Sequence, residues 1–322
     1  MQISRDKKAK NQIIVLLTLT IIAYIVFVVI GMNKNNMDYL LSKRIPKLIA
    51  ISLSGGAIAF SSIIFQTICN NRILTPSVLG LDSVYSFIQT IVVFAFGSTS
   101  IVMTNKNLNF ILSLIGMLII STLLYKFVFG RNNNGIMHLL LVGLILGTFF
   151  SSLTSFMQVI IDPNEYLTLQ SKLIASFNNV NTDIIILCIL IILCILPFIY
   201  DELKLLDVIA LGKEQAINLG VNYDKVMKKL LIVVAVMTAM STALVGPLTF
   251  LGLIVVNVTY QIVKSFKHKY LIITSILISV CSIIVGLIFV ERIFKFTTTL
   301  GVIINFIGGL YFLYLLLKES KL

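Results

Sequence analysis

Long apolar stretches that do not alternate with polar positions dominate this chain. Two of them read IIVLLTLTIIAYIVFVVIG (13–31) and NFILSLIGMLIISTLLY (109–125). A helix needs about 20 apolar residues to cross ~30 Å of hydrocarbon, whereas the strands of a membrane barrel show short segments of alternating polarity. The pattern therefore predicts an all-α polytopic membrane protein.

Hydropathy predicts ten membrane-spanning helices in a single domain, residues 1–322. Six of these spans are cleanly apolar: 13–32, 109–129, 137–161, 183–200, 229–246 and 270–290. Four others carry glycines and polar residues: 46–69, 78–97, 247–263 and 299–317. Small residues let helices approach closely, and polar side chains at membrane depth face other helices or water. These four spans are therefore the candidates for lining a pathway through the bundle.

Basic residues are distributed unevenly among the segments between the spans. Hydrophobic residues make up 58% of the chain and charged residues 12%, and the net charge is +12. An even number of spans puts both termini on one side, and placing them inside gives 17 of the 25 Lys and Arg residues to inner segments. Cytoplasmic loops carry the excess of Lys and Arg. We therefore expect both termini in the cytoplasm of a cell whose plasma membrane holds the protein, and no nucleic-acid partner.

The first apolar stretch follows several basic residues, as the core of a signal peptide does. It is longer than a usual signal core, and no small-residue cleavage site precedes Asn33. We expect it to be retained as the first span.

The sequence contains no familiar catalytic or metal-binding motif. A Walker A loop, an HExxH helix, a CxxC pair and a GxSxG elbow are all missing. His138 and His268 lie beside basic residues at inner boundaries and are predicted to be solvated loop residues. The cysteines lie in or beside apolar stretches and are predicted to be small apolar residues rather than disulfide partners or ligands: Cys69, Cys188, Cys194 and Cys281. We predict no catalytic residue, no metal site and no cofactor.

Ionisable residues are scarce in the predicted spans. Proton- or sodium-coupled carriers usually place several such residues at membrane depth, and Asp82 is the one acid near that depth here. This favours a transport subunit whose energy comes from a partner. The alternative is an ion-coupled secondary transporter of a small organic solute. An intramembrane enzyme, the third class, lacks a nucleophile–base pair.

The segment 201–230 has a different composition from the rest of the chain. Five of its thirty residues are acidic and five are basic, with apolar residues between them. A helix that lies on the bilayer prefers a polar face dominated by Lys and Arg. The balanced charge favours a protein partner on the cytoplasmic side instead.

Several cations are predicted to lie on the outer side, against the general trend. They are Lys43, Arg44, Lys47, Arg292 and Lys295. Long basic side chains at such positions contact lipid headgroups, or they form a docking surface for an acidic external partner. The pattern alone leaves both interpretations open.

Four motifs occur in a fixed order along the chain. They are RIPKLIAISLSGGAIAFSSIIFQTICNNRILTPSVLGLDS (44–83), LLLVGLILGTFFSSLTSFMQVIIDP (139–163), LDVIALGKEQAINLGVN (206–222), and VGPLTFLGLIVVNVTYQ (245–261) with TLGVIINFIGGLYFLYLL (299–316). Together they resemble the permease subunits of binding-protein-dependent ABC importers for iron–siderophores and vitamin B12, the FecCD-like family. The residues of the first and last motifs most resemble those of permeases for catecholate siderophores in Gram-positive bacteria. Val256 and Asn257 stand where the family has Pro-His, and Thr299 and Gly309 replace two further prolines.

The resemblance implies a type II ABC importer permease fold of ten helices, paired with a second permease that is a copy or a paralogue. It implies ATP-binding subunits on the cytoplasmic side, which carry the ATP hydrolysis, and an extracytoplasmic siderophore-binding lipoprotein. The substrate it implies is a ferric siderophore. Three cations match the family's docking positions for the binding protein: Arg44, Lys47 and Arg292.

The resemblance also implies where the pathway and the ATPase contact lie. For the pathway we expect polar residues of the second and eighth spans: Ser61, Ser62, Gln66, Asn70, Asn71, Asn257 and Gln261. Hydrogen bonding between helices without substrate contact is the other interpretation of these residues. For the ATPase contact we expect two short helices, 203–210 and 213–219, with the contact formed by Leu211, Gly212, Lys213, Glu214, Ala216, Ile217, Leu219 and Gly220. Gly220 is expected to end the second helix in a left-handed conformation.

Overall fold

The computed structural model describes residues 2–32, 37–130, 136–178 and 181–319. Every regular element within these ranges is a helix. In chain order they are α1 (Gln2–Val29), α2 (Met37–Cys69), the 3-10 helix η1 (Pro76–Leu79), α3 (Leu81–Phe96), α4 (Ile101–Thr104), α5 (Lys106–Gly130), α6 (Ile136–Ile160), α7 (Pro163–Leu173), α8 (Thr182–Ile209), α9 (Lys213–Asn218), α10 (Tyr223–Val245), α11 (Leu251–Ile262), α12 (His268–Arg292) and α13 (Leu300–Glu319).

The predicted spans match ten of these helices. Within the described ranges, 8 helices are long and apolar enough to cross a membrane. The other two, α3 and α11, are apolar but shorter. Each is bounded by glycines or prolines: Gly80 and Gly97 flank α3, while Gly246 and Pro247 precede α11. The all-α prediction is confirmed, and a helix lies at each of the ten predicted spans.

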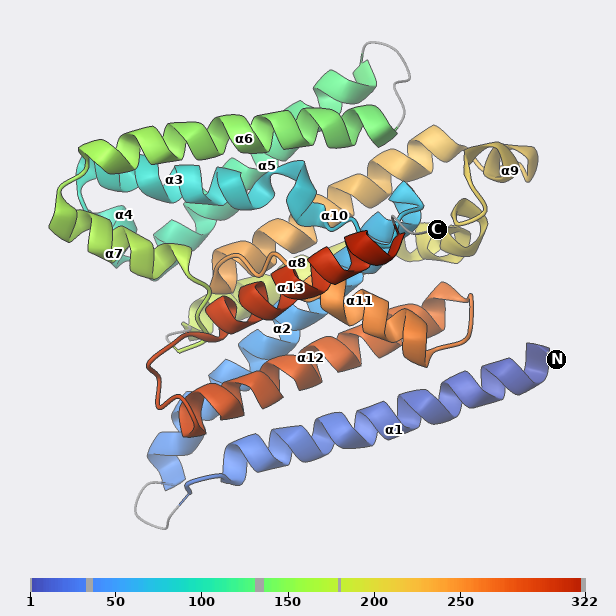
Figure 1. Ribbon diagram of the computed structural model, residues 1–322, viewed down its shortest axis with the longest axis horizontal. Helices are drawn as coiled ribbons and strands as arrows, with labels where there is room; N and C mark the ends of the chain where they lie inside the picture. The colour runs from blue at the N-terminus through green and yellow to red at the C-terminus, as the bar shows by residue number, and fades with distance from the viewer. Residues whose placement is uncertain (1, 33–36, 131–135, 179–180, 320–322) are drawn as a thin grey trace.

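The loops gather at two opposite ends of the bundle (Figure 1). Both termini lie at the same end as α9, and α4 and α7 lie at the other end. We call these the inner end and the outer end, following the Lys and Arg distribution. Arg131, one of the basic residues assigned to the inner side, lies outside the described residues.

The second span, α2, runs through the middle of the molecule (Figure 1). It packs against α8, α10, α11 and α12. On one side its apolar residues join a core with α3, α5, α8 and α10, and on the other a core with α1, α11 and α12. Since lipid is as apolar as leucine, close packing rather than water exclusion holds such helices together. Because α2 is enclosed by its neighbours, most of its polar residues face protein.

Glycines allow the closest helix contacts. Gly80 has φ +79°, and a Cβ built on it would lie 2.8 Å from the Cα of Gly147 on α6. Gly143, one turn earlier on α6, faces Leu79 with a similar lack of space. The Leu-Gly of the first motif thus packs against the glycines of the second motif. Motifs that are about 65 residues apart in the chain are parts of one contact.

A second close contact forms at the outer end. A Cβ on Gly246 would lie 2.8 Å from the Cα of Ala175, and a Cβ on Gly301 would lie 2.8 Å from the Ala175 Cβ. The backbone N–H of Ser176 donates to Val245 O at 2.7 Å. The segment after α7 is therefore held between the starts of α11 and α13.

Three short helices were not predicted from the sequence: η1, α4 and α7. Of these, α7 carries a readable signal. Asp162 accepts a hydrogen bond from the Asn164 backbone N–H at 2.8 Å, and Pro163 occupies the first turn. Asp before Pro at a helix start is a common N-terminal arrangement.

Candidate functional site

The inner end presents a short amphipathic helix, α9, between two long ones. Gly212 (φ +99°) precedes it, and Gly220 (φ +84°) follows it. The Gly220 N–H donates to Ile217 O at 2.9 Å, and the Val221 N–H donates to Ala216 O at 3.0 Å. These two hydrogen bonds form a Schellman motif, in which a left-handed residue satisfies the last carbonyls of a helix. The predicted conformation of Gly220 is confirmed.

The apolar residues of this segment divide into buried and exposed ones. Ala216 is fully buried against its own chain. Leu211, Ile217 and Leu219 are exposed, with Leu219 at 63%. Around them, Lys213 lies 3.9 Å from the carboxylate of Asp224, and Glu214 is exposed. An exposed apolar patch with a charged rim is typical of a surface that contacts another protein.

The prediction of a separate short helix over 203–210 is wrong. Helix α8 continues without interruption to Ile209. No glycine or proline stands between 198 and 211, so nothing breaks the helix as it leaves the apolar region. Lys229 of α10 pairs with Glu202 of α8 at 2.6 Å and fixes this extension against its neighbour.

At the outer end, two of the three predicted docking cations already have partners within the chain. Arg44 Nη1 donates to the carbonyls of Phe27 (2.6 Å), Val28 (2.9 Å) and Ile30 (2.6 Å). The carbonyls of Phe27 and Val28 are among the last of α1, which have no partner inside that helix, and Ile30 lies in the turn that follows. Arg44 thus caps α1 from the neighbouring α2.

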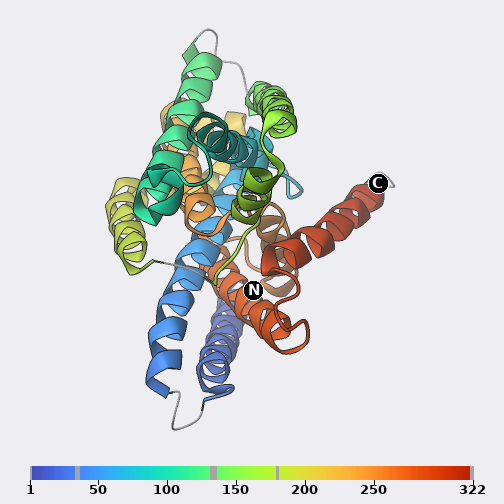
Figure 2. The ribbon, with the colours of Figure 1, turned by 90° about the vertical axis from the view of Figure 1, so that its left-hand side faces the viewer.

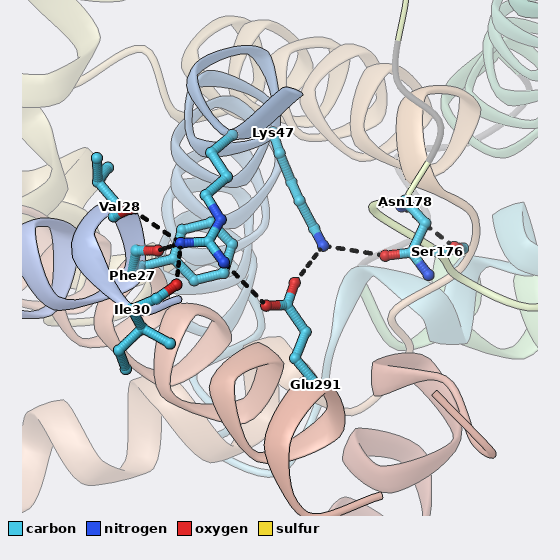
Figure 3. Close-up of polar contacts among 8 residues, drawn as sticks. Phe27, Val28, Ile30, Lys47, Ser176, Asn178 and Glu291 are labelled. Carbon is cyan, nitrogen blue, oxygen red and sulfur yellow. Dashed lines mark hydrogen bonds and ion pairs between the residues drawn. The ribbon is translucent and has the colours of Figure 1, made fainter. Parts of the chain in front are cut away.

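Lys47 lies at the centre of the same cluster (Figure 3). Its Nζ donates to Glu291 Oε1 at 2.9 Å and to Asn178 Oδ1 at 3.0 Å. Glu291 also lies 3.9 Å from Arg44. The third predicted cation, Arg292, is exposed. A docking role for this group stays a prediction, and Arg292 is its accessible member.

The polar residues predicted for the pathway separate into three groups. Ser61 and Ser62 are buried inside the bundle, beside a narrow space of about 10 Å³ that Asp82 and Thr249 also line. The Thr249 hydroxyl donates to Asp82 at 2.9 Å. A space this small holds one water molecule at most. These residues have the environment of interhelical contacts.

Three others, Gln66, Asn70 and Asn71, line an inner cavity of about 880 Å³. This cavity opens between the inner ends of α1, α2, α8, α11 and α12, and Arg72, Lys264 and Lys267 contribute to its walls. Neither polar atom of the buried Gln66 amide has a hydrogen-bond partner within the described residues. Each buried hydrogen-bonding group that is left without a partner destabilises the protein by about 1–3 kcal/mol. The Gln66 amide can therefore form hydrogen bonds with a molecule that occupies the cavity.

The remaining two pathway residues lie apart from the cavity. The amide of Asn257 donates to Arg72 O at 3.0 Å and to Leu253 O at 2.9 Å, and Gln261 contacts the Tyr311 hydroxyl at 3.4 Å. With Val256–Asn257 in place of the family's Pro-His, α11 runs unbroken through this point. Asn257 therefore connects α11 to the turn after α2 by a hydrogen bond and does not line the cavity.

The prediction that both histidines are solvated loop residues is wrong for His268. His268 is 4% exposed, and both its ring nitrogens have partners: Asp207 at 2.6 Å and Thr67 at 2.8 Å. His138 is half-buried in the first turn of α6. The partners of His268 are 61 and 201 residues away in the chain, so no local pattern indicates them.

The four cysteines are free, and within the described residues no group of three His, Cys, Asp or Glu side chains comes together to hold a metal ion. The arrangement provides an exposed contact helix at one end, a cationic cluster at the other, and an inner cavity between helices.

Comparison with known proteins gives one consistent result. The sequence profile of the FecCD transport family matches residues 11–318. The petrobactin import system permease protein YclO of Bacillus subtilis (strain 168) is 54% identical over 286 residues, which cover 89% of this chain and 91% of the relative. The petrobactin import system permease protein FatC of Bacillus anthracis is 32% identical over 280 residues, 87% of this chain and 79% of the relative.

The fold is similar to that of a solved structure. An inward-facing structure of a metal-chelate type ABC transporter superposes with a TM-score of 0.83, at 20% sequence identity, over 96% of this chain and 99% of that one. The expected type II importer permease fold is confirmed.

Proposed function

The chain belongs to the FecCD transport family, and we propose that it is the membrane-spanning permease of an ABC importer that moves a catecholate-type ferric siderophore inward. The iron chelate is the cargo, and ATP is hydrolysed on a separate subunit. The whole chain, residues 1–322, forms the one permease domain, and residues 201–230 form its cytoplasmic coupling segment.

The substrate class is supported by the relatives and by the sequence motifs together. Both relatives are named for the import of petrobactin, which is a catecholate-type siderophore. The first and last motifs of the chain resemble permeases of the same class. The ion-coupled secondary transporter has no support among these relatives.

The exposed apolar side chains of α9 and of the residues on either side of it carry the assignment of the ATPase contact. Leu211, Ile217 and Leu219 project from the inner end, and their segment ends in a rigid Schellman turn. A few apolar anchors surrounded by a polar rim dominate the affinity of most protein interfaces. In this proposal, ATP-binding subunits in the cytoplasm bind this surface.

The outer end is proposed to receive a siderophore-binding lipoprotein through its cations. Arg292 is exposed there, and Arg44 and Lys47 lie beside it in the cluster around Glu291. Complementary charge steers encounter and sets orientation more than it adds affinity. An acidic patch on the binding protein is the matching surface.

A second permease, a copy of this chain or a paralogue, is proposed to cover the face formed by α6. Figure 2 shows α6 and α13 diverging at one side of the bundle. Exposed hydroxyl groups occupy about two turns in the second half of α6: Thr148, Ser151, Ser152 and Ser155. Polar side chains at membrane depth face protein or water rather than lipid. The pathway of the assembled pair would lie on this face, whereas Gln66, Asn70 and Asn71 line the inner cavity between α1, α2, α8, α11 and α12.

The ATPase contact is tested by changing the exposed anchors. Leu219→Asp combined with Ile217→Asp places two charges in the proposed interface, and we expect loss of ATPase association in detergent and of iron-dependent uptake in cells. Lys204→Gln, at an exposed position of α8 outside the proposed contact, is the control and is expected to keep both. Normal assembly of the double variant would contradict the assignment of α9.

A further inference from the structure

Three side chains from three helices form a hydrogen-bonded cluster at the inner end. They are Asp207 on α8, His268 at the start of α12, and Thr67 near the end of α2. Asp207 Oδ1 lies 2.6 Å from His268 Nδ1, and His268 Nε2 lies 2.8 Å from Thr67 Oγ1. His268 is buried, and the Asp207 side chain is half exposed. The cluster thus connects the surface of the inner end to the interior of the bundle.

Asp207 also caps the N-terminus of α12. The backbone N–H of His268 donates to the same Asp207 oxygen at 2.8 Å. The residue at the N-cap position of α12, Lys267, makes no side-chain cap hydrogen bond. A carboxylate at a helix N-terminus satisfies an otherwise unpaired N–H and interacts favourably with the helix dipole. Since this carboxylate comes from α8, the end of α8 and the start of α12 are held together.

The second hydrogen bond of His268 extends the connection to α2. Thr67 directly follows Gln66, the buried residue whose amide has no partner among the described residues. Gln66, Thr67, Asp207 and His268 all line the inner cavity. A shift of Asp207 relative to α2 would therefore change the wall of the cavity at Gln66.

The other end of the cluster is close to α9. Asp207 lies in the last turn of α8, which ends at Ile209, and α9 begins at Lys213. A short turn joins them, in which the Gly212 N–H donates to Ile209 O at 3.0 Å. Any force applied to α9 reaches Asp207 through this turn.

We propose that Asp207, His268 and Thr67 are positioning residues that transmit the movement of α9 to the inner cavity at Gln66. The inference rests on the proposed function, because α9 moves with the ATP cycle only if it contacts an ATPase. Coupling between distant sites is carried by elements with discrete arrangements, and a hydrogen-bonded link between rigid helices is such an element. The three residues set how much transport results from each ATP hydrolysed, without contacting ATP.

The test measures the number of ferric chelate molecules imported per ATP hydrolysed, in proteoliposomes that contain the assembled importer. Asp207→Asn removes the charge, and Thr67→Val removes the hydroxyl at nearly constant shape. Each is expected to lower the ratio about threefold to tenfold while ATP hydrolysis continues. The controls are Asp201→Asn, on the exposed side of the same helix, and Thr122→Val, whose hydroxyl bonds only to its own helix at Leu118 O. Both controls are expected to keep the wild-type ratio.

The double variant Asp207→Asn with Thr67→Val separates a shared link from two independent defects. Both changes break one link. We therefore expect the double variant to import as much chelate per ATP as the single variant with the lower ratio. Two independent defects would instead multiply their fold-losses. If Asp207→Asn does not fold, Thr67→Val decides alone, since it lies far from α9. A wild-type ratio in assembled Thr67→Val complexes would overturn the inference. Failure of the unmodified chain to bind an ATPase would instead overturn the proposed function.

Discussion

Lys47 of α2 and Glu291 of α12 form an ion pair of 2.9 Å, and both side chains are largely buried, at 12% and 14% exposure. Through Arg44, which lies 3.9 Å from Glu291 and caps α1, the pair joins three helices at the outer end. Removing one member of a buried pair leaves the other charge without compensation. The cations of the first motif therefore stabilise the fold, whatever they do for a partner.

Glu291→Ala is expected to destabilise the isolated permease. Lys47 and Arg44 would lose their acidic partner while remaining mostly buried, at a cost of about 2 kcal/mol. Thermal unfolding in detergent is the measurement, and a lower Tm is the expected result. Glu214→Ala, an exposed position, is expected to leave the Tm unchanged. Equal unfolding temperatures for Glu291→Ala and the parent chain would contradict the stabilising role.

Arg292→Glu is expected to separate docking from stability. Arg292 is exposed, so the charge reversal should weaken association with the binding protein without lowering the Tm. The loss should be largest at low salt, because the Debye length falls from about 10 Å at 0.1 M to about 3 Å at 1 M. Binding measured at several salt concentrations checks this. An affinity unchanged at every concentration would favour contact of Arg292 with lipid headgroups.

Arg44→Glu is the companion variant to Arg292→Glu. The three carbonyls at the end of α1 would lose their donor, and an acidic group would face Glu291. We expect this variant to lower the Tm by more than Arg292→Glu does. A Tm equal to that of the parent chain would show that Arg44 does not hold α1 in place.

Gly80→Ala is expected to loosen the contact between η1 and α6. The new Cβ would lie 2.8 Å from the Gly147 Cα, and the backbone has a positive φ. We expect a loss of about 2–4 kcal/mol in the free energy of unfolding. Gly220→Ala is the matched control: its φ is also positive, but no atom lies within 4 Å of the added Cβ. That variant should lose only about 1 kcal/mol, and equal losses in both would contradict the packing role of Gly80.

The fold was predictable to a large extent because each span carries its own signal. A run of about 20 apolar residues indicates a helix whatever surrounds it. Gly212 and Gly220 indicate where α9 begins and ends. The short helices η1, α4 and α7 lack such a run of apolar residues, and of the three only α7 carries a local signal, the Asp162–Pro163 start. The family resemblance implies a separate short helix over 203–210, but nothing in this segment disfavours a helix, so α8 continues through it to Ile209.

The candidate sites were less predictable because their contacts join distant parts of the chain. The partner of Lys47, Glu291, is 244 residues away, and Thr67 is 201 residues from His268. The sequence shows that a polar residue lies at membrane depth, but not which neighbour satisfies it. Ser61 and Ser62 therefore have the environment of interhelical contacts, while Gln66 on the same helix reaches the inner cavity.

The most direct test reconstitutes the permease pair, the ATP-binding subunits and the binding protein in proteoliposomes and measures accumulation of radiolabelled ferric petrobactin. We expect accumulation only when ATP is supplied to the side of the ATP-binding subunits, and none from the permease pair alone under a proton or sodium gradient. Uptake by the permease pair alone, driven by an ion gradient without nucleotide, would contradict the assignment of the chain as an ATP-driven import subunit.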